Sequence, residues 1–190
     1  MNHHMLKKPL SKNQLDDLTD GLVNAMKYCD PSVLYPSDLD KAKPNDGVDP
    51  EWFLPIYNGS NSFSELSAIM MYTTQEAQFE EVGELMLGIG LTEMKHYGKL
   101  GEFIRAIGGD ITEAYNSEES VIGSTPEGAI EQALKGEKET IKFYDELSDK
   151  ISKVEETETT RIALQFISKL IADEVVHVKL LNERKKNGFQ

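Results

Sequence analysis

Apolar residues recur every three or four positions through most of the chain after residue 62, the spacing that places them on one face of an α-helix. The pattern predicts four long helices, over Phe63–Phe79, Val82–Ile107, Pro126–Ile151 and about Glu158–Lys186. No stretch alternates apolar and polar residues as a half-buried strand does. The expected fold class is therefore all-α.

Residues 1–61 have a different pattern and form a separate predicted unit. They contain six of the seven prolines and several turn sequences, and only residues 11–28 show helical spacing. We expect an irregular N-terminal arm with one short helix over 1–61, and a helical bundle over 62–190.

Two of the predicted helices carry the same short motif on their apolar face, Glu93 with His96 and Glu174 with His177. Residues three apart on a helix point the same way, so each Glu and His pair faces the core. A buried carboxylate without a partner costs several kcal/mol. Lysine and arginine side chains or metal ions must therefore supply positive charge between these helices.

The other two helices each place a glutamate seven residues before a tyrosine, Glu65 before Tyr72 and Glu137 before Tyr144. The chain is thus an internal repeat of two helical hairpins. If the acids of each hairpin lie at one level, its turn must fall midway between them. The midpoints are residue 79 and residues 155–156, both in polar stretches suited to turns. All four acids can then meet at one level, provided that the segment after Gly108 crosses the length of the bundle.

This layout resembles the ferritin-like di-metal carboxylate superfamily, and most of all its rubrerythrin-like members. The resemblance covers residues 62–186 and implies a four-helix bundle of two hairpins joined by a long crossover. It implies six metal ligands and no catalytic residue apart from them: Glu65, Glu93, His96, Glu137, Glu174 and His177. Glu93 and Glu174 would be the acids that bridge both metals.

The resemblance also implies groups that support the ligands. Tyr72 and Tyr144 would lie next to the cluster. Asp173, directly before Glu174, is expected to accept a hydrogen bond from His96, because a ligating imidazole usually donates its other N–H to an acceptor. Thr92, at the equivalent position of the second helix, would support His177 weakly or not at all.

The expected cofactor is a pair of iron ions, with manganese as an alternative, since two divalent ions cancel four carboxylates and oxygen-rich sites favour these metals. The expected activity is that of a cytoplasmic oxidoreductase in oxidative stress, a peroxidase or oxidase acting on peroxide or oxygen with an external electron donor. The alternatives are a ferritin-like iron-binding or ferroxidase storage protein and a manganese-catalase-like enzyme that dismutates peroxide.

Two departures from rubrerythrins bear on this activity. Thr140 occupies the position of a further glutamate, which leaves the ligand switch of that family in doubt. The chain has a single cysteine, which excludes the rubredoxin iron module and any internal disulfide. Electrons would therefore have to come from a separate donor.

Composition limits the partners. A net charge of −13 argues against binding nucleic acid or an anionic membrane surface. No apolar run approaches the roughly 20 residues of a spanning helix, and no leader pattern opens the chain. We expect a homodimer or larger homo-oligomer.

Overall fold

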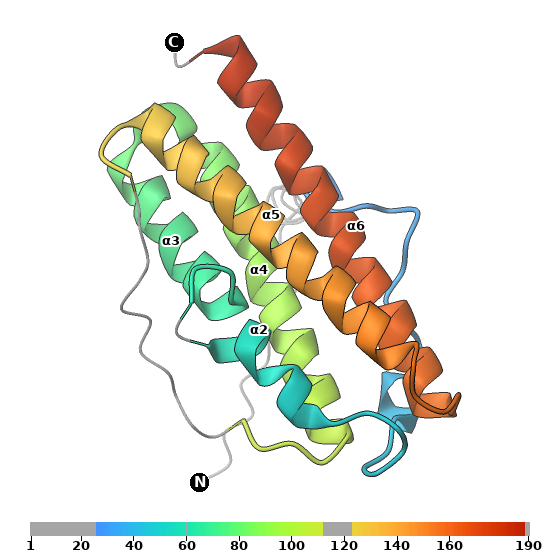
Figure 1. The fold of residues 1–190 in the computed structure, drawn as a ribbon. Coiled ribbons are helices and arrows are strands. Elements are labelled where there is room, and N and C mark those ends of the chain that lie inside the picture. Colours follow the sequence, from blue (N-terminus) through green and yellow to red (C-terminus); the bar gives the residue numbers. More distant parts are fainter. Residues whose placement is uncertain (1–25, 60, 112–122, 189–190) are drawn as a thin grey trace, which may run out of the picture.

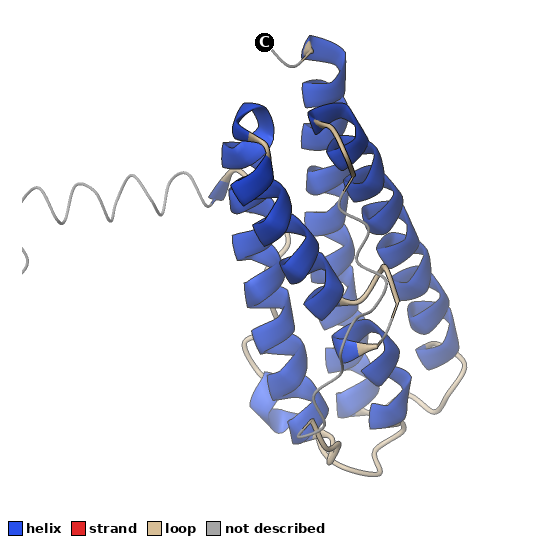
Figure 2. Ribbon diagram, turned by 90° about the vertical axis from the view of Figure 1, so that its left-hand side faces the viewer, coloured by secondary structure: helices blue, strands red, loops and turns tan. Residues whose placement is uncertain are grey.

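The computed structural model describes residues 26–59, 61–111 and 123–188. In these residues the chain forms helices and no strand, which confirms the predicted all-α class (Figures 1 and 2). Four long helices form the bundle: α3 (Glu65–Gln78), α4 (Glu80–Ala106), α5 (Pro126–Ile151) and α6 (Glu158–Asn187). The helix predicted over residues 11–28 lies almost wholly outside the described residues.

The long helices pair as two hairpins, α3 with α4 and α5 with α6. Phe79 alone separates α3 from α4, and residues 152–157 separate α5 from α6, so both turns include the midpoints predicted from the glutamate spacing. In Figure 1, α4 ends at the bottom of the bundle and α5 begins at the top. The described residues that flank this connection therefore lie at opposite ends of the bundle, as expected.

Local capping explains where α4 ends and α5 begins. The Thr125 side chain accepts a hydrogen bond from the Gly128 N–H, and Pro126 occupies the first turn. After α4, Gly108 adopts a φ of 89°, and the Gly109 N–H donates to the Ile104 carbonyl at 2.8 Å. Thr-Pro before a helix and Gly-Gly after one are sequence patterns typical of these ends.

The described part of the arm contains short helices that the sequence reading did not predict: two 3₁₀ turns (Leu39–Lys41 and Pro50–Trp52) and α2 (Leu54–Asn58). Phe53 and Ile56 are fully buried and belong to the same apolar cluster as Phe103 and Phe166 of the bundle. This part of the arm thus contributes to the core. The domain boundary at residue 61 stays a prediction.

The apolar core consists of two clusters with a polar layer between them. On α4, Met86 and Ile89 belong to one cluster, and Leu100 and Phe103 belong to the other. The segment between these pairs carries Glu93 and His96 on the same buried face. Apolar side chains therefore shield the polar layer from solvent at both ends.

Glycines at two positions of α4 allow close packing there. A Cβ on Gly90 would lie 3.2 Å from the Tyr72 Cβ of α3, and a Cβ on Gly88 would lie 2.0 Å from the Tyr28 ring. Gly90 thus permits a close approach of α4 to α3. Gly88 permits a contact with the arm instead.

Candidate metal centre

The six residues that the resemblance implied as ligands lie together in the polar layer, and none is more than 4% exposed. They come from all four long helices: Glu65 on α3, Glu93 and His96 on α4, Glu137 on α5, Glu174 and His177 on α6. The fold thus brings together side chains that are up to 112 positions apart in the sequence, since 177 − 65 = 112.

Their ligand atoms form two overlapping groups. One contains Glu65 and His96, and the other contains Glu137 and His177. Glu93 and Glu174 belong to both groups. Within each group, one nitrogen or oxygen from every residue lies within 4.8 Å of the others, which is compact enough for a metal ion.

The shared carboxylates each face both imidazoles. His96 Nδ1 lies 3.1 Å from Glu93 Oε2 and 3.2 Å from Glu174 Oε1. His177 Nδ1 lies 3.0 Å from Glu93 Oε1 and 2.9 Å from Glu174 Oε2. One oxygen of each carboxylate is therefore directed to each imidazole, which is the arrangement a bridging ligand requires.

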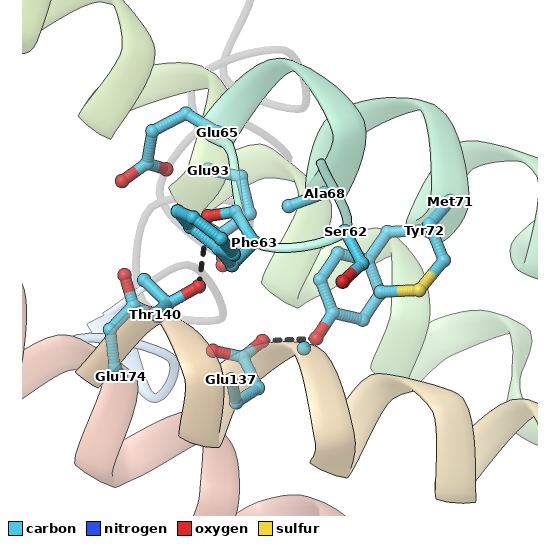
Figure 3. Close-up of a pocket in the computed structure, with 11 residues that line it drawn as sticks. Ser62, Phe63, Glu65, Ala68, Met71, Tyr72, Glu93, Glu137, Thr140 and Glu174 are labelled. Atoms are coloured by element: carbon cyan, nitrogen blue, oxygen red, sulfur yellow. Dashed lines mark hydrogen bonds between the residues drawn. The ribbon is translucent and has the colours of Figure 1, made fainter. Parts of the chain in front are cut away.

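The other two carboxylates each lie near one imidazole, at 3.6 Å for Glu65 and 3.4 Å for Glu137. The Tyr144 hydroxyl donates a hydrogen bond to Glu65. The Tyr72 hydroxyl donates one to Glu137 (Figure 3). The tyrosine of α3 thus holds the glutamate of α5, and the tyrosine of α5 holds the glutamate of α3. Each bond leaves the second oxygen of the glutamate directed to the cluster.

The predicted contact between His96 and Asp173 is present, with Nε2 3.1 Å from Oδ2. Asp173 is fully buried and also accepts hydrogen bonds from the Lys169 ammonium and the Asp30 backbone N–H, both at 2.6 Å. Burial opposes ionisation of Asp173, but the bonds from His96 and Lys169 hold the pKa of this carboxyl below its usual range. The result is an ionised acceptor that orients the His96 ring.

His177 has a different acceptor, which the sequence reading missed. Its Nε2 lies 2.9 Å from the backbone carbonyl of Tyr28, in the arm. Thr92 does not take this role; its hydroxyl donates instead to the Gly88 carbonyl at 3.3 Å. Every residue has a backbone carbonyl, so the sequence does not mark this acceptor. Only Gly88 hinted at the contact, because a larger residue there would leave no room for the Tyr28 ring.

The carboxylates differ in proton affinity. Burial raises the pKa of Glu65 to about 8, and burial together with the nearby Glu174 raises the pKa of Glu137 well above its usual value. Burial acts the same way on Glu93 and Glu174, but the two histidines outweigh it and lower the pKa of both carboxyls. The shared acids are therefore the ionised pair.

Burial disfavours the charged imidazoles, but the surrounding carboxylates raise the pKa of His96 and His177 well above the usual value. Without metal, these shifts favour protons on both imidazoles and on Glu65 and Glu137, next to the ionised Glu93 and Glu174.

The donor set fits a pair of divalent ions. Three buried oxygens, Glu65 Oε2, Glu93 Oε1 and Glu174 Oε1, accept no hydrogen bond from any described residue, although each lies within 3.6 Å of an imidazole nitrogen. Once the imidazoles are neutral, as metal ligation requires, these carboxylates need another cationic partner. Four carboxylates with one imidazole for each ion suit hard or borderline metals.

Fold and site together define a helical bundle that encloses a carboxylate and histidine cluster able to hold metal ions. Residues 64–185 match the ferritin-like domain, so the chain belongs to the ferritin-like domain family. The predicted superfamily is thereby confirmed, while the rubrerythrin-like subtype stays a prediction. No curated protein matches the chain. Within the described residues, no helix is long and apolar enough to span a membrane.

Replacing Asp173 with Asn is expected to lower metal affinity about 10-fold or more, because the uncharged amide no longer favours the ligating form of His96. Isothermal titration with a divalent ion measures the affinity, and circular dichroism checks that the helices remain. The exposed Asp149→Asn variant is the matched control. Unchanged affinity in Asp173→Asn would show that this contact does not tune the site.

Proposed function

We propose that the chain is a di-iron oxidoreductase that reduces hydrogen peroxide or dioxygen in the centre of the bundle, with electrons from an external donor. The observation that supports this most is that Glu93 and Glu174 each face both imidazoles. Two ions held by these carboxylates and imidazoles would supply the two electrons that cleavage of an O–O bond requires. Reduction of peroxide to two waters takes two electrons and two protons, and the donor restores the electrons.

The residues of the chain position and enclose this chemistry. Tyr72 and Tyr144 fix Glu137 and Glu65 by hydrogen bonds, and Asp173 and the Tyr28 carbonyl orient the imidazoles. The apolar clusters on either side exclude bulk water, which strengthens every electrostatic interaction inside. Two ions held by only six protein groups would have room to bind an oxidant.

The proposal includes a cytoplasmic, rubrerythrin-like role in oxidative stress and self-association. For self-association, the half-exposed Leu87, Leu91 and Met94 offer an apolar surface along α4. The charge of −13 supports a proposal without nucleic acid as a partner.

The first experiment loads the purified chain with iron, counts bound metal by mass spectrometry, and follows peroxide consumption with and without a reductant. We expect about two irons per chain and consumption that requires the reductant. Oxygen release from peroxide without a reductant would favour a catalase-like manganese enzyme. Uptake of many irons per chain would favour storage, and a chain that binds no metal would contradict the proposal.

A further inference from the structure

A small cavity opens between α3 and α5 directly over the carboxylate cluster (Figure 3). Its volume, measured as space for the centre of a water-sized sphere, is about 10 Å³, which is room for about one water molecule. All four glutamates of the cluster form its inner end, and no histidine lines it. The cavity thus reaches the site from the side opposite the imidazoles.

The inner end of this cavity is polar and incompletely satisfied. Among its lining residues, Glu65, Glu93 and Glu174 each have one buried oxygen that accepts no hydrogen bond from the described residues. A packing defect in an apolar core would be lined by apolar atoms. A cavity that ends on carboxylate oxygens is instead suited to a small polar molecule.

Gly136, directly before Glu137 on α5, lines the cavity and keeps it open. A Cβ added there would lie 3.5 Å from the Ser62 carbonyl oxygen and 3.8 Å from the Met71 Cε, which are ordinary contact distances. Neither packing nor backbone conformation therefore demands glycine, although glycine weakens a helix interior relative to alanine. What the glycine provides is the space itself, and Ala68 faces the same cavity from α3.

The outer rim is tied in place by two hydrogen bonds between the segment before α3 and the surface of α5. The Thr140 hydroxyl donates to the Phe63 carbonyl at 3.1 Å, and the Ser62 hydroxyl donates to Glu139 Oε2 at 2.8 Å. The Phe63 ring also stacks on Phe143, with centroids 5.3 Å apart. The rim is therefore held on both sides and resists widening.

We propose that this cavity is the port through which the oxidant reaches the cluster, and that Gly136 and the Ser62–Phe63 segment restrict it to small unbranched molecules such as hydrogen peroxide or dioxygen. The inference rests on the proposed function. A space of one water's volume admits an O–O molecule end-on but excludes the branched carbon group of an alkyl hydroperoxide.

The test fills the port without disturbing the ligands. Gly136→Ala and its control Gly98→Ala, on α4 with no atom within 4 Å of the added Cβ, both improve helix propensity and should raise the melting temperature by about 2–4 °C. Both variants should bind as much iron as the wild type. Only Gly136→Ala should weaken azide binding to the iron-loaded protein, by about 10-fold or more, and slow peroxide consumption.

Phe63→Ala tests the effect of widening the port. Removing the ring should widen the rim and raise the rate with tert-butyl hydroperoxide relative to the rate with hydrogen peroxide, with metal content unchanged. If Gly136→Ala binds azide as tightly as the wild type, the proposal that the cavity is the port is wrong. Loss of iron from this variant would also contradict the proposal. An iron-loaded wild type inert to peroxide and oxygen would refute the proposed function, and the azide comparison would still decide the port.

Discussion

Replacing Glu93 with alanine is expected to reduce the metal content from about two ions per chain to one or none. Both groups of ligand atoms include Glu93, so its loss removes a ligand oxygen from both metal sites at once. Glu174→Ala should have the same effect for the same reason. Glu65→Ala affects one group only and should leave the other position occupied.

Mass spectrometry of the purified variants after loading measures this difference. Glu102→Ala on α4 and Glu183→Ala on α6 are matched controls, because both side chains are exposed on the same helices. Two metals retained by both Glu93→Ala and Glu174→Ala would show that these acids do not bridge.

The second large effect is the pH dependence of stability. Without metal, the protein should lose stability as pH rises from about 5 to 8, whereas stabilisation by added metal should grow over the same range. Glu65 has a pKa of about 8 when folded and an ordinary value of 4.5, so the folded state binds an extra proton between these values. Stability falls with pH wherever the folded state binds more protons.

The other groups do not oppose this fall in stability between pH 5 and 8. The raised pKa values of His96 and His177 give stability that is present below 6.5 and lost as pH rises through the folded values. The lowered pKa values of Glu93 and Glu174 give stability that is present above 4.5 and lost as pH falls through the folded values. Metal competes with protons for all these groups, so metal affinity rises with pH.

Thermal melts of the metal-free and metal-loaded protein at several pH values test this prediction. The metal-free melting temperature should fall by roughly 5 °C or more between pH 5 and 8. Glu65→Gln, which keeps an uncharged side chain at every pH, should reduce that fall. Equal melting temperatures with and without metal at pH 8 would contradict this prediction.

The sequence determined the helices and the level of the acids. Helix periodicity and the capping signals at Thr125 and Gly108 located the four long helices to within about two residues. The equal spacing of glutamates about the two turns predicted that Glu65, Glu93, Glu137 and Glu174 could meet. These features depend on residues close together in the chain or on simple helix geometry, and so they can be read from one sequence.

Tertiary structure decided which atoms face one another. That Tyr72 bonds to Glu137 and Tyr144 to Glu65 depends on how the two hairpins pack, which spacing along one helix does not specify. The same holds for the acceptor of His177, a backbone carbonyl 149 positions away in an arm whose turns have no periodic pattern. The cavity beside Gly136 exists only because α3 and α5 leave space there, and a single glycine in the sequence does not reveal what faces it. Local chemistry sets each helix and its polar positions, but packing between helices sets the directions of hydrogen bonds and the empty space.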